Sequence, residues 1–337
     1  MDSLFLTDPP GVFVTKEQAI AEFFQHNQID PAQIARYLDP KLERLSEKVD
    51  QWLAIVKPSD RELFLRLLSR YTYLTNEASV RRYHEGIHIL TEKLQPFGLS
   101  LCDLLFISTE SSDKRKSGSD HVRTDLHRLC MGQIDACQIV ASTCRLSADE
   151  LAGYRGFVFV DDIVGTGFTL RRTISSFLDQ FPDFINAPLF MLCIVPTDAG
   201  LSYLIGQLKK RDVNIIPVYN QEWIAVPAFQ HADIFAASER DDAIERVRKY
   251  EALIDAYMKD PEKSYILGFW GCRQLVSFYY NTPNNTLCTF WRWTDSHTPL
   301  FPREKQPQIR LKYLQSVKRK KDDNAYRIKA EQRTEEK

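Results

Sequence analysis

The pattern of apolar positions changes near residue 101 of this chain. Before that point, apolar side chains recur every three or four positions, which is the spacing of the buried stripe of an amphipathic helix. Stripes of this kind run over Ala19–Phe24, Leu42–Leu53 and Leu63–Tyr71, and prolines separate them. We therefore expect a helical N-terminal region over residues 1–100.

Short apolar runs replace the helical stripes after residue 101. They suit strands that are buried on both faces of a parallel sheet, and their alternation with helical or turn segments is typical of βαβ units. The third and fourth runs are separated by an amphipathic segment, residues 170–181, which predicts a crossover helix. The expected fold class is α/β, with a mostly parallel sheet flanked by helices over residues 101–300. The five runs are Leu104–Ile107, Cys137–Ala141, Phe157–Val160, Leu189–Val195 and Val213–Val218.

The C-terminal third of the chain carries three further patterns. A charged helix is expected over Glu239–Met258, and the aromatic and β-branched stretch Tyr265–Trp293 predicts strands joined by a turn at Pro283 and Asn284. Beyond Pro302 the chain is strongly charged. Residues 301–337 are therefore expected to form a weakly helical or disordered tail.

Composition narrows the classes of protein that remain. The formal net charge is -1 over 337 residues, so no global field attracts nucleic acid or a membrane surface. The seven cysteines form no CxxC pair, which favours reduced thiols. The start of the chain lacks the features of a signal peptide, and no apolar run is long enough to cross a bilayer. We expect a cytoplasmic protein that does not engage the membrane.

The strongest chemical signal is the segment Gly156–Leu170, which reads GFVFVDDIVGTGFTL. Its apolar strand ends at two adjacent acids, Asp161 and Asp162. Ligands of open α/β sheets bind at the carboxyl ends of strands. Carboxylates repel phosphate but accept hydrogen bonds from neutral hydroxyls, directly or through a bound Mg²⁺.

A glycine loop follows the acids and leads into a helix. Gly165 and Gly167 let the backbone approach a ligand closely, and the N–H groups at a helix start form an anion site. Thr166 and Thr169 add hydroxyl donors. Acids beside such a loop predict a site for a sugar that carries both hydroxyls and a phosphate; the alternative is a plain strand–turn–helix joint with incidental acids.

The same segment resembles the phosphoribosyl pyrophosphate (PRPP) loop of type I phosphoribosyltransferases. That pattern is four apolar residues, two acids, three variable residues, Thr-Gly, one variable residue and Thr, and all of it is present. The resemblance implies that Asp161 and Asp162 are catalytic, contact the ribose 2- and 3-hydroxyls and hold Mg²⁺. It implies that the 5-phosphate is wrapped by Gly165, Thr166, Gly167, Phe168 and Thr169.

Two neighbouring loops bear on whether such a site turns over its ligand. The basic loop Thr109–Ser119 follows an apolar strand. Its residues Lys116, Ser117 and Gly118 have the right chemistry to hold a diphosphate. The alternative is a solvated surface loop. The loop Thr143–Arg155, where this family carries a long catalytic lid, is short here. A short lid excludes water less well, and it favours a non-catalytic binding module.

A second resemblance covers about Trp52 to Trp291. The block Tyr265–Trp291, and most specifically its stretch Asn281–Thr286, resembles phosphoribosyltransferase-like effectors of bacterial conflict systems, some of which are encoded beside retron reverse transcriptases. This implies an antiphage effector that is restrained by a reverse transcriptase and its nucleic acid, and a homo-oligomer is a further expectation. The asparagines of the stretch either serve the site or only build a turn.

Three functions therefore remain as hypotheses. The first is an enzyme that acts on PRPP or a nucleotide at the ribose anomeric carbon. The second is a module that senses PRPP or a nucleotide and regulates a partner. The third and most distant is a zinc metalloprotease, because His84–His88 matches HExxH. Gly86 weakens that helix, no third ligand motif follows, and an exposed amphipathic helix explains the match as well.

Overall fold

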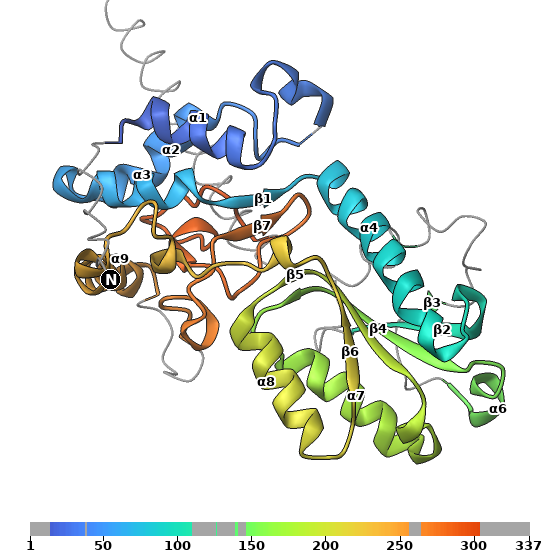
Figure 1. Cartoon of the computed structure of the whole chain (residues 1–337). Coiled ribbons are helices and arrows are strands. Elements are labelled where there is room, and N and C mark those ends of the chain that lie inside the picture. Colours follow the sequence, from blue (N-terminus) through green and yellow to red (C-terminus); the bar gives the residue numbers. More distant parts are fainter. Residues whose placement is uncertain are drawn as a thin grey trace, which may run out of the picture.

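The structure is a computed structural model, and it describes residues 14–37, 39–109, 126, 139–140, 146–255 and 264–303. Figure 1 shows a twisted sheet with helices on both faces, next to a smaller part in which helices surround a two-stranded sheet. The basic loop Lys116, Ser117 and Gly118 lies outside the described residues, as does the tail after Arg303.

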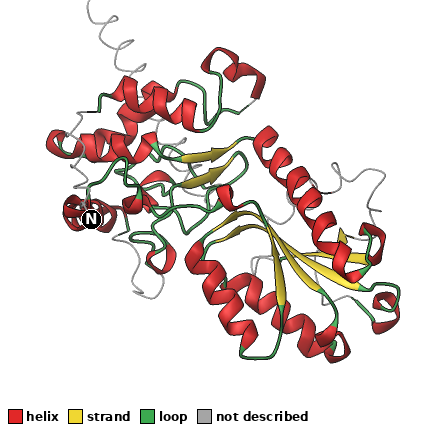
Figure 2. Ribbon diagram, viewed as in Figure 1, coloured by secondary structure: helices red, strands yellow, loops and turns green. Residues whose placement is uncertain are grey.

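The larger sheet has five parallel strands, and this confirms the expected α/β class (Figure 2). Its two central strands are apolar along almost their whole length, as expected for strands covered on both faces. Within the described residues, no helix combines the length and the apolar content that a bilayer crossing requires. In spatial order the strands are β3 (Ile139–Val140), β2 (Leu104–Ser108), β4 (Gly156–Val164), β5 (Leu189–Pro196) and β6 (Ile215–Val218).

Helices cover both faces of this sheet. Side chains of α4 (Asn76–Leu94) share a core with one face, and those of α7 (Phe168–Gln180) and α8 (Asp198–Lys209) share a core with the other. Successive strand residues alternate between the two cores, as the pleat requires. Helix α7 is the predicted crossover helix, and short α6 (Ala148–Leu151) precedes β4.

The N-terminal helices form where the apolar stripes predict them. They are α1 (Lys16–His26), α2 (Leu45–Trp52) and α3 (Arg61–Ser69). Their core includes aromatic rings from the far end of the chain, since Trp52 lies 4.7 Å from Phe290 and Tyr71 lies 4.7 Å from Phe301, measured between ring centroids. The N-terminal helices and the last described residues therefore stabilise each other.

The structure corrects the expectation for residues 265–293. Only β7 (Val276–Phe278) is a strand there, and it pairs in parallel with β1 (Thr72–Leu74) instead of with a neighbour in its own block. Leu267, Trp270 and Arg273 have positive φ, which a strand cannot accommodate. The predicted turn is present, because the Thr286 N–H donates to the Pro283 carbonyl at 3.2 Å. The predicted charged helix is α9 (Arg240–Ile254).

Short 3-10 helices connect these elements. They are η1 (Pro31–Tyr37), η2 (Leu53–Ile55), η3 (Pro58–Asp60), η4 (Gln95–Phe97), η5 (Leu101–Asp103), η8 (Pro182–Asn186), η9 (Gln221–Trp223), η10 (Ala228–Gln230), η11 (Ala237–Glu239), η13 (Phe269–Gly271) and η14 (Cys288–Phe290).

Candidate functional site

The adjacent acids Asp161 and Asp162 lie near the carboxyl end of β4, the central strand of the large sheet. Each is only 9% exposed. Burial raises the pKa of Asp161 well above its usual value, and the neighbouring charge of Asp162 raises it further. Burial also raises the pKa of Asp162. Ionising both buried groups is therefore costly when no ligand is bound.

Polar partners from two other parts of the chain reach these acids. The Tyr280 hydroxyl donates to Asp162 Oδ2 at 2.8 Å, and the Thr109 side chain bonds to Asp161 from the end of β2. The Asp162 backbone N–H donates to Asp161 Oδ1 at 3.1 Å. Both hydroxyls favour the ionised acids and lower their pKa values in part. The carboxylates are thus held in place by neutral donors, as a sugar hydroxyl would also hold them.

The glycine loop between β4 and α7 depends on a close contact with α8. Gly167 has φ 71° and is the N-cap of α7, and a Cβ there would lie 2.4 Å from the Gly200 carbonyl oxygen. A Cβ on Gly200 would lie 2.3 Å from the Val164 carbonyl oxygen. The Thr197 hydroxyl lies 2.8 Å from the Gly165 carbonyl. Glycine is therefore required on both sides of this contact.

The same loop presents donors at the start of a long helix. No side chain caps the 13-residue helix α7. The Phe168 N–H donates weakly to Thr166 Oγ1 at 3.4 Å, and Thr169 is exposed in the first turn. An uncapped helix start with nearby hydroxyls can bind an anion such as phosphate.

The C-terminal block covers this loop. A Cβ on Gly165 would lie 2.4 Å from the side-chain Cγ of Asn285, so the amide packs directly on the loop backbone. Trp270, which is 63% exposed, has its ring centroid 6.0 Å from that of Phe168. Sequence reasoning left Asn285 between a site role and a turn role, and it missed Tyr280 and Trp270. The aromatic character of the block was the one signal that could have pointed to them.

A protein-family model, PRTase-CE, matches residues 49–303. The match covers more than half of the chain and includes both the acid–glycine segment and the C-terminal block. The chain belongs to the PRTase-CE family. No curated protein and no solved structure matches the chain. PRTase-CE is a phosphoribosyltransferase-like family, so this is a phosphoribosyltransferase-like protein, and its parallel sheet agrees with such a fold.

The acids of this PRTase-CE chain suit a magnesium ion. Mg²⁺ is usually held by one or two carboxylates together with phosphate oxygens of the substrate and water. Asp161 and Asp162 offer two carboxylates, and the described residues contain no cluster of three or more candidate metal ligands. The two acids would hold the ion, and the ligand would supply the remaining oxygens.

The HExxH histidines of the PRTase-CE chain lie on exposed positions of α4. His88 Nδ1 is 3.5 Å from Glu92 Oε1, and Glu85 accepts a hydrogen bond from Asn220 Nδ2 at 2.5 Å. No third ligand joins the histidines within the described residues. Gly86 has a packing role, because a Cβ there would lie 2.6 Å from Leu192 Cδ1 of β5. Contacts with neighbouring residues therefore account for Glu85, Gly86 and His88.

Proposed function

We propose that this PRTase-CE protein binds PRPP or a nucleotide through its ribose 5-phosphate and acts on it at the anomeric carbon. The observation that supports this most is the buried pair Asp161 and Asp162, which precedes the glycine loop at the uncapped start of α7. The acids suit the ribose hydroxyls, and the loop suits the 5-phosphate. One ligand with both groups satisfies both halves of the site.

The proposed chemistry is cleavage of the bond between the ribose C1 and its leaving group. The leaving group takes the electron pair, positive charge develops on the ribose ring, and a base or water attacks C1. Asp161 and Asp162 fix the ring hydroxyls beside this charge, and Gly165–Thr169 anchors the far end of the sugar. Bound Mg²⁺ supplies charge neutralisation for a leaving diphosphate.

Binding is expected to change the protonation of the acid pair. Without ligand, burial raises the pKa values of both groups, and the charge of Asp162 raises that of Asp161 further. Ligand hydroxyls that donate to the carboxylates, or a cation between them, favour the ionised form. Binding is therefore expected to lower the pKa values of the pair, and any proton that is released would be measured as a buffer-dependent binding enthalpy.

A sensing module is the second candidate function, and one contact favours it. The block that contains Tyr280 and Asn285 already contacts both halves of the site. A ligand that takes over the oxygen bonded by Tyr280 would displace the block and so signal to a partner without turnover. We also propose a role in antiphage defence, restrained by a reverse transcriptase and its nucleic acid, on the resemblance of residues 281–286.

The double variant Asp161→Asn with Asp162→Asn tests this function. We expect it to fold and to melt at a higher temperature than the parent without ligand, because it removes buried charge repulsion. It should lose the Mg²⁺-dependent part of the thermal stabilisation by PRPP that we expect of the parent. Mass spectrometry of the mixture then separates the candidates, since an enzyme yields a cleaved or transferred ribose 5-phosphate and a sensor leaves PRPP intact.

A matched control exists in the exposed neighbours Asp241 and Asp242 at the start of α9. Changing both to Asn makes the same two substitutions at exposed positions away from the site. Stabilisation by the ligand should therefore stay as in the parent. An unfolded Asp161/Asp162 variant would show that these acids are structural. Unchanged PRPP binding in that variant would show that they do not hold the ribose.

A further inference from the structure

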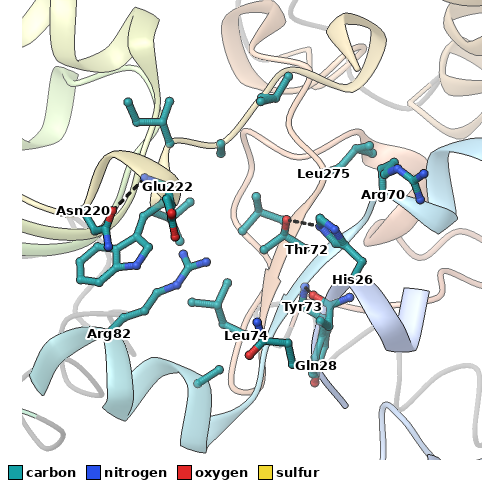
Figure 3. A pocket seen from close by; sticks show the side chains of 18 of the residues that line it. His26, Gln28, Arg70, Thr72, Tyr73, Leu74, Arg82, Asn220, Glu222 and Leu275 are labelled. Carbon is teal, nitrogen blue, oxygen red and sulfur yellow. Dashed lines mark hydrogen bonds between the residues drawn. The ribbon is translucent and has the colours of Figure 1, made fainter. Parts of the chain in front are cut away.

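A cavity of about 510 Å³ lies where the N-terminal helices meet the carboxyl edge of the large sheet (Figure 3). Its walls come from the end of α1, from β1 and β7, from the first turns of α4 and from the segment after β6. Its lining residues include none of Asp161–Thr169. Its volume is in the range of small-molecule sites, which is about 300–1,000 Å³.

Arg82 extends from α4 into this cavity (Figure 3). Its Nη1 donates to the Ile194 carbonyl at 2.8 Å, and its guanidinium lies 5.7 Å from the centroid of the Trp223 ring. Burial lowers the pKa of Arg82 to about 10, and the charge of Arg81 contributes. A partly desolvated guanidinium has five N–H donors, and leaving its charge unpaired is unfavourable.

The arginines around the cavity differ in how their charge is matched. Arg70 forms ion pairs with Glu22, at 2.8 Å, and with Asp233. Arg81 donates to the neutral Gln28 Oε1 at 3.3 Å. Among the ion pairs of the described residues, none involves Arg81 or Arg82. The α4 wall of the cavity therefore offers two guanidinium groups to an anion.

Two carboxylates restrict which anion fits: Glu222 lies on the segment after β6, and Glu85 lies on α4 beside the arginines. Glu222 lines the cavity from η9, and its backbone N–H donates to Asn220 Oδ1 at 3.0 Å. Asn220 Nδ2 in turn donates to the Glu85 carboxylate at 2.5 Å. These carboxylates repel a bare anion and accept hydrogen bonds from hydroxyl or amino groups. The cavity thus combines a site for negative charge with a site for neutral donors.

We propose that this cavity is a second ligand site, for a phosphate ester of a polyol or nucleoside. Arg81 and Arg82 hold the phosphate, because the planar guanidinium matches two phosphate oxygens at once. Glu222 and Glu85 accept hydrogen bonds from the hydroxyl or amino groups of the ester. The site does not depend on the function proposed for Asp161 and Asp162.

The second site is mechanically close to the first. Val195 lines the cavity, and on β5 it pairs with Ile163 of β4, the residue after Asp162. Two residues later, Thr197 contacts the Gly165 carbonyl at 2.8 Å. A ligand in the cavity would therefore contact β5 next to Val195, on the strand that pairs with the acid-bearing strand β4.

Calorimetry on the full-length Asp161→Asn/Asp162→Asn variant isolates the second site, since the first site should no longer bind. We expect AMP or ribose 5-phosphate to bind with one equivalent per chain, at least tenfold more tightly than inorganic phosphate or adenosine. Adding Arg82→Gln should weaken the ester at least tenfold. Adding Arg248→Gln, on an exposed arginine of α9, should change nothing.

Two results would overturn the proposal. One is the absence of binding by both esters, and the other is inorganic phosphate binding as tightly as they do. Should Arg82→Gln fail to fold, the exposed Glu222→Gln decides the question. This substitution should reduce, by several-fold, the ratio of the affinity for the ester to the affinity for inorganic phosphate. An unchanged ratio would show that the Glu222 carboxylate does not bind the ester.

Discussion

The Tyr280 hydroxyl donates a hydrogen bond to Asp162 Oδ2 at 2.8 Å, although the two residues are 118 positions apart in the chain. Both side chains are buried. The contact joins the aromatic C-terminal block to the acid pair of the large sheet. In the proposed function a ribose hydroxyl binds the same oxygen, so that proposal links the position of the block to the binding of a ligand.

Tyr280→Phe tests that link. Removing the hydroxyl should destabilise the unliganded protein by about 1–3 kcal/mol, because a hydrogen bond to an acidic partner is lost. The freed Asp162 oxygen should bind a ligand hydroxyl without competition. We therefore expect the stabilisation by PRPP and Mg²⁺ to be larger than in the parent, measured by thermal shift at several ligand concentrations.

Tyr203→Phe on α8 is the control. It also removes a half-buried phenol hydroxyl, but Tyr203 is not among the groups that act on the two acids. It should leave the ligand effect unchanged. A Tyr280→Phe protein that no longer responds to ligand would place Tyr280 among the binding residues instead.

Gly165→Ala should disrupt the contact between the loop and the block. The new Cβ would lie 2.4 Å from the Asn285 side chain, so the amide or the loop must move. Such overpacking costs about 1–3 kcal/mol of unfolding free energy. We expect ligand stabilisation to fall as well, since the same loop is proposed to hold the 5-phosphate, and urea unfolding with and without ligand measures both effects.

A double-mutant cycle identifies the cause. Asn285→Ala removes the obstructing amide, so Gly165→Ala should cost less in that background, with a coupling of about 1 kcal/mol or more. Gly206→Ala is the matched control, because nothing lies within 4 Å of its Cβ on α8. There, alanine should stabilise the helix by about 0.5–1 kcal/mol. Fully additive costs at Gly165 and Asn285 would contradict the contact.

The buried Glu251 should make stability depend on pH. It lies on α9 and accepts hydrogen bonds from the Thr289 N–H, at 3.0 Å, and from the Leu267 N–H. Burial raises its pKa from 4.5 to about 7. Between these values the folded state keeps a proton that the unfolded state has lost. The contribution of Glu251 to stability is therefore greatest below about pH 4.5 and falls as the pH rises through 7, by up to about 3 kcal/mol.

Glu251→Gln removes this titration, so the measurement is the difference in unfolding free energy between parent and variant from pH 4.5 to 8. The comparison cancels His297, whose pKa burial lowers to about 4 and which acts in the opposite direction. It is made in the Asp161→Asn/Asp162→Asn background, because that acid pair titrates in the same sense. A difference that stays constant with pH would contradict the raised pKa.

The HExxH segment yields a pair of contrasting substitutions. His88→Ala removes an exposed side chain and should change stability by less than about 0.5 kcal/mol. Gly86→Ala should destabilise by about 1–3 kcal/mol despite the better helix propensity of alanine, because its Cβ would lie 2.6 Å from Leu192 Cδ1. Elemental analysis should find no stoichiometric zinc. One zinc per chain that disappears in His88→Ala would support the metalloprotease hypothesis.

Local patterns predicted the parts of this protein that are made from contiguous residues. The apolar stripe of Leu63–Tyr71 predicts α3, and the run Phe157–Val160 predicts the buried strand β4, because helices and buried strands repeat with their own periods. The sequence also predicts the acid–glycine segment. Its two acids, its loop and the start of α7 follow one another in the chain, so backbone geometry alone brings them together.

Tertiary structure decided everything that joins distant segments. No local pattern indicates that β7 pairs with β1, that Tyr280 bonds to Asp162, or that Arg82 reaches a cavity shared with Glu222. The aromatic content of the block after Tyr265 predicts strands. In the structure its side chains pack into several different cores, and positive φ values at Leu267, Trp270 and Arg273 interrupt an extended backbone. Long-range packing of this kind depends on the whole chain, and so only the folded structure reveals it.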